Sequence, residues 1–339
     1  MKKIPAILMC AVMALTITAC SNDNEIPYSK DKDKESSTVS DNSSNSNENS
    51  SNSDDGGSSD SITPDSDSSV PEMPAAAESD FQFTDYKDGV QILSYSGGGI
   101  GDVVIPKTLG GKSVVSIGEN VFAHRNGITS ITIPDGVTEI CGYAFAYIGT
   151  LKAITIPDSV NTIGDAAFYN CVDLVTIAIP DSVTSIGEGC FFECARLTNV
   201  HIGNSVASIG AVAFRNCNEL VNINIPNSVT SIGKGAFMGC GSLVNIDIPN
   251  GVTSIGEGAF IGCSLTSIDI PDSVTSIGNQ AFASIFSLTN INIGSGVTSI
   301  GAGMDEGAFE WSYNIQATYK GKTYDYAHIN DLYKEINGN

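Results

Sequence analysis

A phrase of about 23 residues recurs along most of the chain. Residues 156–160 read Ile-Pro-Asp-Ser-Val, residues 179–183 repeat these letters, and residues 225–229 differ only by Asn in place of Asp. A fixed period in this range predicts a solenoid, because each unit can bury its apolar face only against its neighbours. Nine phenylalanines mark the same period: Phe122, Phe145, Phe168, Phe191, Phe214, Phe237, Phe260, Phe282 and Phe309.

A single repeat predicts its own local structure. Residues 174–179 follow the pattern Leu-x-x-Ile-x-Ile, and the alternation at its end indicates a short strand. Pro180 ends this strand because proline lacks an amide hydrogen, and residues 183–186 have the β propensity of a second strand. Gly187 permits a tight bend. The Gly-x-x-Ala-Phe step that follows fits one helical or 3-10 turn, which would place the phenylalanine in the core.

The repeated phrase Ile-Pro-x-x-Val-Thr-x-Ile-Gly-x-x-Ala-Phe resembles the BspA-like leucine-rich repeats of bacterial surface lipoproteins. The resemblance covers residues 83–339, roughly, and matches in the same frame in every copy. It implies a β-rich solenoid, a right-handed superhelix of about nine 23-residue turns with short parallel strands and helical or 3-10 turns. It also implies adhesion, since relatives of this kind include binders of extracellular-matrix glycoproteins.

Both ends of the repeat array depart from the pattern in a way that predicts caps, which solenoids need to cover an open core. Residues 81–122 hold an N-terminal cap and the first repeat, with a hairpin around Lys87-Asp88-Gly89. Residues 123–310 hold the remaining repeats, with four extra residues around 303–306. Residues 311–339 predict a C-terminal cap made of a hairpin over 318–324 and a short amphipathic helix over 330–336.

The first residues resemble an export signal. Lys2 and Lys3 precede an apolar run that is too short to span a bilayer, and the run ends in Ile17-Thr18-Ala19-Cys20. This end resembles the signal box of bacterial lipoproteins, in which the thiol of the final cysteine is lipidated. The resemblance implies a signal peptide over residues 1–19, lipidation of Cys20 and membrane attachment through that lipid alone. The alternative is an ordinary secretory peptide with an incidental cysteine.

Residues 20–80 predict a disordered acidic tether behind Cys20. The segment is rich in Ser, Asn and Asp and nearly lacks large apolar residues, so it cannot bury enough surface to fold. Residues 21–80 carry 15 acids and three lysines, a net −12 of the whole chain's −22. This acidity argues against nucleic-acid binding, which needs a basic surface. The segment would lift a single folded solenoid, which we expect to be monomeric, off the membrane.

Five cysteines occupy the same position in successive repeats. Stacking of the repeats should place them about 5 Å apart. Three explanations are open: a string of metal ligands, disulfides, or a ladder of small buried side chains. Cys141 and Cys190 bring the number in the repeats to seven, so they cannot all pair, and neither Cys-x-x-Cys nor a histidine set accompanies them. We favour the buried ladder and expect no metal. The column comprises Cys171, Cys194, Cys217, Cys240 and Cys263.

No enzyme is predicted. The histidines His124, His201 and His328 lie far apart in the repeat frame and begin no metal-binding motif. No nucleophile elbow or phosphate-binding loop is present, and the glycines follow the repeat. We therefore expect neither catalytic residues nor a cofactor.

The outward positions of the predicted strands give the best binding hypothesis. They change from Thr and Ala in the early repeats to Asn and Asp in the later ones and contain no aromatic residue. Such a face could hydrogen-bond a peptide or a glycan, or its small polar residues could merely solvate the sheet and form asparagine ladders. The candidate ligand-binding residues are Asn199, His201, Asn222, Asn224, Asn245, Asp247, Asp269, Asn290 and Asn292.

A second column follows each core phenylalanine and could be lateral packing or a partner surface: Tyr169, Phe192, Arg215, Met238 and Ile261. Exposed together, these side chains would be unusual for a monomer.

The function predicted from these observations is adhesin-like. We expect a lipid-anchored protein of the bacterial cell surface, outside the cytoplasm, whose solenoid sheet binds a host or environmental protein or glycan. A structural surface spacer without a specific ligand is the alternative. A concave and chemically varied face would favour the binding protein, and a uniformly small face without hollows would favour the spacer.

Overall fold

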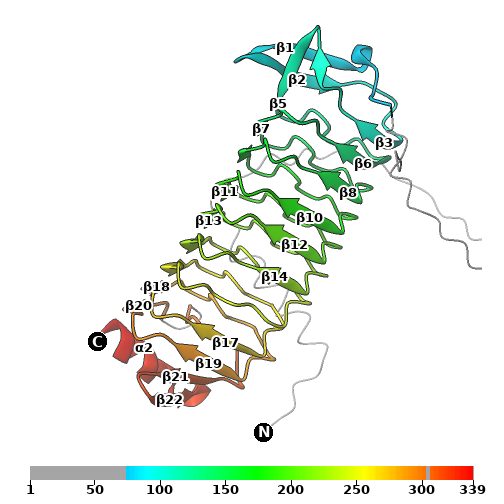
Figure 1. The fold of residues 1–339 in the computed structure, drawn as a ribbon. Helices are drawn as coiled ribbons and strands as arrows, with labels where there is room; N and C mark the ends of the chain where they lie inside the picture. Colours follow the sequence, from blue (N-terminus) through cyan, green and yellow to red (C-terminus); the bar gives the residue numbers. More distant parts are fainter. Residues whose placement is uncertain (1–73, 303–305, 339) are drawn as a thin grey trace, which may run out of the picture. The chain divides into compact units, whose positions relative to one another are not determined.

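The computed structural model describes residues 74–302 and 306–338, which form a stack of similar turns (Figure 1). The predicted signal peptide, Cys20 and most of the predicted tether lie outside the described residues, as do Gly303, Met304 and Asp305 of the predicted insertion. The solenoid, its repeat period and its capped ends are as the sequence predicts.

The first strand of each turn joins parallel ladders on one side of the stack, which we call sheet 1. Strands pair one turn apart in matching register, as in Ile177 with Val200 and Val200 with Ile223. Sheet 1 comprises three ladders, and its strands are β3 (Gly101–Val104), β6 (Ile128–Thr132) and β8 (Ala153–Thr155); β10 (Thr176–Ile179), β12 (Asn199–Ile202) and β14 (Asn222–Asn224); and β17 (Ser267–Ile270), β19 (Asn290–Ile293) and β21 (Gln316–Tyr319).

The second strand of each turn builds sheet 2. It is shorter than the four residues predicted, because most of these strands comprise only a serine or a polar residue and the isoleucine that follows. The strands are β5 (Lys112–Ile117), to which β4 (Thr108–Leu109) adds antiparallel, then β7 (Glu139–Ile140), β9 (Thr162–Ile163), β11 (Ser185–Ile186), β13 (Ser208–Ile209), β15 (Ser231–Ile232), β16 (Ser254–Ile255), β18 (Ser276–Ile277) and β20 (Ser299–Ile300).

The segment that carries each phenylalanine corrects our expectation of a helical or 3-10 turn. It consists of non-helical turns in which two residues per turn adopt a left-handed backbone, such as Ala166 (φ 54°) and Asn170 (φ 56°). Alternate N–H groups on this side donate to the next turn of the stack, as Phe168 does to the carbonyl of Cys190, while those between them donate locally, as Tyr169 does to the carbonyl of Ala166. Hydrogen bonds between turns thus alternate with local ones, and the segment does not continue into a helix.

Phenylalanine rings form a continuous column through the core. Successive rings from Phe122 to Phe309 stack with centroids 5.2–5.8 Å apart, and each is fully buried. Offset stacking of this kind is favourable beyond the area it buries. The inward Ile, Val and Leu of both sheets surround the column and join it into one hydrophobic core.

Glycine at the bend after sheet 2 has a different role from the one predicted. Gly187 and Gly210 do not have positive φ, so the bend itself does not require glycine. The turns approach so closely that a Cβ on Gly210 would lie 2.7 Å from the carbonyl carbon of Gly187. Close stacking therefore explains the glycine column.

Caps close both ends as predicted. At the N-terminal end, η1 (Glu78–Asp80) precedes a hairpin of β1 (Phe81–Tyr86) and β2 (Gly89–Tyr95), and the Tyr95 ring packs 5.0 Å from that of Phe122. At the other end, β21 pairs with β22 (Lys322–Asp325), followed by η2 (Tyr326–His328) and α2 (Ile329–Asn337). Tyr333 of α2 stacks on Phe309 and completes the aromatic column.

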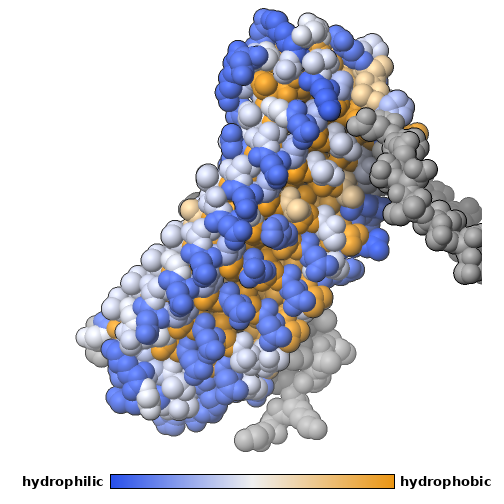
Figure 2. Space-filling view, in the orientation of Figure 1, coloured by the Kyte–Doolittle hydropathy of each residue, from blue (hydrophilic) through white to orange (hydrophobic). Residues whose placement is uncertain are grey.

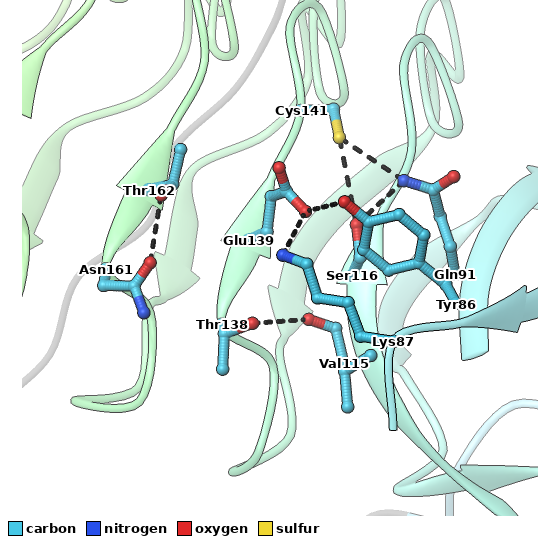
Figure 3. A network of polar contacts seen from close by, with 10 residues as sticks. All are labelled: Tyr86, Lys87, Gln91, Val115, Ser116, Thr138, Glu139, Cys141, Asn161 and Thr162. Atoms are coloured by element: carbon cyan, nitrogen blue, oxygen red, sulfur yellow. Dashed lines mark hydrogen bonds and ion pairs between the residues drawn. The ribbon is translucent and has the colours of Figure 1, made fainter. Parts of the chain in front are cut away.

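A polar network fastens the N-terminal hairpin to the first turns (Figure 3). The Tyr86 hydroxyl donates to Glu139 Oε2 at 2.8 Å, and Lys87 Nζ lies 3.3 Å from the same oxygen. Gln91 Nε2 donates to Ser116 Oγ at 2.9 Å and lies 3.6 Å from the Sγ atom of Cys141. Cys141, which replaces the bend glycine of other repeats, thus faces the cap.

Candidate interaction surface

Sheet 1 presents the predicted candidate residues to solvent. Along β12, for example, Val200 and Ile202 point into the core while Asn199 and His201 point outward, as the period-2 geometry of a strand requires. All nine predicted residues are exposed: Asn199, His201, Asn222, Asn224, Asn245, Asp247, Asp269, Asn290 and Asn292.

Strand register gathers these residues into two columns. In the first column Asn199 lies opposite Asn222. In the second, His201 lies opposite Asn224, and further along Asp269 lies opposite Asn292. Among the nine candidate residues, Asn245 and Asp247 alone lie on a segment without sheet 1 pairing, although it occupies the same place in the repeat.

Hydrogen bonds along these columns are sparse. Asn292 Nδ2 donates to Asp269 Oδ1 at 2.6 Å, which links two turns. Asn199 and Asn290 instead bond the hydroxyls of their neighbouring threonines. Within the described turns no continuous asparagine ladder forms, and the amides of Asn222, Asn224 and Asn245 keep their donors and acceptors for solvent or a partner.

Two hollows indent sheet 1 where its ladders are interrupted. The larger, of about 420 Å³, lies beside the break between β8 and β10 and is lined by Asp158, Asp181 and His201 among others. The smaller, of about 150 Å³, lies at the unpaired turn between β14 and β17, and Asn245, Asp247 and Asp269 line it. The face is therefore indented and chemically varied.

A column of exposed valines borders the same face, and the sequence analysis did not single it out. Val175, Val221 and Val244 precede their strand positions by one residue and are 37%, 45% and 39% exposed. The sequence could have predicted their exposure, because each valine directly follows the buried leucine of its repeat. Figure 2 shows hydrophilic and hydrophobic residues interleaved over the stacked turns.

The three histidines occupy unrelated places. His201 lines the larger hollow, the ring of His124 stacks on Tyr147 at 4.5 Å, and His328 Nδ1 lies 2.6 Å from Asp325 Oδ1. In residues 74–302 and 306–338 no group of three His, Cys, Asp or Glu side chains could hold a metal ion.

The cysteine column is a buried ladder of free thiols, which confirms the interpretation favoured from the sequence. Each Sγ donates to a phenylalanine carbonyl in the preceding turn, as Cys171 does to Phe145 at 3.1 Å. The same contact recurs at Cys194, Cys217, Cys240 and Cys263. Burial raises the thiol pKa throughout, to about 12 at Cys171 and Cys240.

The second predicted column is lateral packing rather than an open patch. Met238 and Ile261 are buried and form a small cluster with Ala283. The Tyr169 ring stacks on Phe192 at 4.7 Å, and the Arg215 guanidinium lies 5.5 Å from the Phe192 centroid. Tyr169 and Arg215 thus cover the Phe192 ring, so its faces are not open for a ligand to stack on.

Comparison with known proteins supports the assignment made from the repeat. The sequence profile of the BspA type leucine-rich repeat region matches six copies over residues 115–240 and 207–323. A leucine-rich repeat protein of T. pallidum is 34% identical, with a TM-score of 0.53 over 56% of this chain and 89% of that one.

A leucine-rich repeat protein of Bacteroides ovatus is 24% identical, with a TM-score of 0.49 over 70% of this chain and 80% of that one. None of the curated proteins compared with the chain matches it. Among the described residues no helix is long and apolar enough to cross a membrane.

Proposed function

The chain belongs to the BspA-type leucine-rich repeat proteins, and on that premise we propose that it is a bacterial surface binding protein. Sheet 1 is its binding face, and an extracellular protein or glycan is its partner. The observation that carries this proposal is the indented face itself, whose exposed amides, carboxylates and imidazole are largely unpaired.

The physical basis of binding is the rigidity of the scaffold. Each strand is fixed by its ladder and by the packing of its inward isoleucines, so the outward side chains are held in a regular array. A rigid array loses little conformational entropy when a partner docks, and this favours recognition over a broad surface.

A glycan and matrix-protein array probed with the full chain tests the proposal. We expect hits that are lost in Asn224→Trp, which places a large ring in the middle of sheet 1 at an exposed position. The matched control is Glu119→Trp, at an exposed position outside sheet 1. An array without hits would favour the structural spacer, and hits that Asn224→Trp leaves intact would show that sheet 1 is not the binding face.

Attachment through Cys20 is a separate part of the proposal. We expect Cys20→Ala to release the protein from the membrane fraction, because only the thiol can form the thioether to lipid. Cys10→Ala is the control, since that cysteine lies within the predicted signal peptide. Retention of the Cys20→Ala protein in the membrane fraction would refute lipid anchoring.

A further inference from the structure

We infer that the partner of sheet 1 is a polypeptide that places basic side chains in the two hollows. This inference rests on the proposed function, which names the face, and adds the chemistry of the ligand. It follows from the charge of the hollows, from the apolar side chains at the edges of the face and from the distance between the hollows.

Each hollow carries a pair of carboxylates from adjacent turns. Asp158 and Asp181 line the larger one, and Asp247 and Asp269 line the smaller one. Every ion pair in the described residues lies elsewhere, so none of these four carboxylates has a cationic partner within the chain. The outward strand positions from 199 to 292 contain neither lysine nor arginine.

Charge complementarity therefore selects a cation. A guanidinium or ammonium group that entered a hollow would be attracted by two carboxylates at once, and partial exclusion of water would strengthen that attraction. Acidic glycans and nucleic acids would be repelled. Neutral glycans find no aromatic ring to stack on at the outward positions of these strands.

The apolar contacts of the face point to a polypeptide rather than a small cation. Val175, Val221 and Val244 are exposed along the edge at which the strands begin, with Thr198 at the same position between the first two. Ile156, Ile179 and Pro180 line part of the larger hollow. The aliphatic stems of arginine and lysine pack on apolar surface of this kind while their charged ends reach carboxylates.

The distance between the hollows specifies the spacing of the basic residues. Asp181 and Asp247 are three turns apart along the stack, which corresponds to about 15 Å at the usual separation of neighbouring strands. They are also three residue positions apart along the strand direction, because Asp181 follows its strand and Asp247 precedes Ile248, which adds an offset of about 10 Å across the sheet. In an extended chain, side chains four residues apart point to the same side and are separated by about 14 Å. A segment with basic residues at positions i and i+4 that runs obliquely across the stack fits both hollows, because long arginine or lysine side chains span the remaining offset.

The test uses the full chain and a synthetic, otherwise neutral peptide of about twelve residues that carries arginines at i and i+4. Titration calorimetry at low salt compares it with a twin in which both arginines are glutamine. We expect the arginine peptide to bind and the twin to bind at least about tenfold more weakly, with the difference shrinking at high salt.

Protein variants locate the interaction. Asp247→Asn/Asp269→Asn should weaken arginine-peptide binding about tenfold, and Asp158→Asn/Asp181→Asn should do the same. Asparagine keeps an acceptor for Asn292 and for the Asn204 amide, so the fold is preserved. Glu119→Gln/Glu219→Gln changes the net charge equally at exposed positions outside sheet 1 and should bind like the wild type.

Every outcome decides between the two proposals. If both aspartate pairs bind the peptide like the wild type, or if the control pair weakens binding equally, the basic-peptide inference is overturned. If array ligands are lost in Asn224→Trp but not in either aspartate pair, sheet 1 is the binding face and only its ligand chemistry is wrong. If neither kind of variant affects any ligand, the proposed function itself fails.

Discussion

The side-chain amide of Asn337 pairs with both backbone groups of Ile300. Its Oδ1 atom accepts the Ile300 N–H at 2.9 Å, and its Nδ2 atom donates to the Ile300 carbonyl at 3.0 Å. Ile300 ends β20, the last strand of sheet 2, where a further turn would otherwise supply these bonds. One asparagine of the C-terminal helix thus replaces the backbone of the missing turn and blunts an open sheet edge.

Removal of this pairing should loosen the end of the solenoid. We expect Asn337→Ala to cost about 1–2 kcal/mol locally, because a partly buried donor and acceptor lose their partners. The readout is hydrogen exchange of the Ile300 amide, which should quicken by roughly 5- to 30-fold. Asn330→Ala, at an exposed position of the same helix, should leave that amide unchanged. Equal exchange in the two variants would mean that Asn337 does not cap the sheet.

Truncation in the phenylalanine column should be costly. Phe214 is fully buried between Phe191 and Phe237, at 5.2 and 5.4 Å. We expect Phe214→Ala to reduce the free energy of unfolding by about 3–5 kcal/mol, since it removes ring contacts on both sides and leaves a cavity. Urea denaturation followed by circular dichroism measures this. Leu93→Ala, at a side chain that is 48% exposed, should cost less than about 1 kcal/mol.

Close stacking makes a sharp prediction for the glycine column. Gly210→Ala should destabilise the protein by about 1–3 kcal/mol, because the new methyl group meets the backbone of the preceding turn. Gly241→Ala is the matched control, since a Cβ there would have no neighbour within 4 Å and the backbone φ is not positive. The control should be neutral or slightly stabilising. A tolerated Gly210→Ala would show that the turns can separate.

Period and alternation were sufficient to predict the places and register of the strands, except at residues 245–248, which form no strand. Even the shorter spacing before Ile270 leaves the turns aligned, because Ser254 still pairs with Ser276. The left-handed residues beside the phenylalanines were not predictable in this way. Val212 adopts φ 47° although β-branched residues disfavour that conformation. Its N–H donates to the backbone carbonyl of Lys234 in the next turn. Contacts between turns overrode the local preference.

The binding face was predictable only as a list of outward positions. Asn245 and Asp247 match the residue types of neighbouring strands, yet their turn is unpaired and forms a hollow. The residue types of this turn match those of its neighbours, and the one mark in the sequence is the 22-residue spacing between Ile248 and Ile270, which predicts neither the lost pairing nor a hollow. The hollows, and with them the charge pairs, required the structure.

Thiol reactivity should separate Cys141 from the buried cysteine column. Cys141 is half-buried beside Ser116, while Cys171, Cys194 and the other described cysteines are fully enclosed. We expect a maleimide reagent to label Cys141 in the folded protein and to reach the enclosed thiols only in denaturant. Burial raises the pKa of the Cys141 thiol, so its labelling rate should keep rising with pH beyond the range in which the labelling rate of an exposed cysteine levels off.

Peptide mass spectrometry of the labelled protein assigns each site, and Cys141→Ser provides the control. Native labelling of Cys194 or Cys217 at a comparable rate would show that the core opens and would contradict the buried ladder.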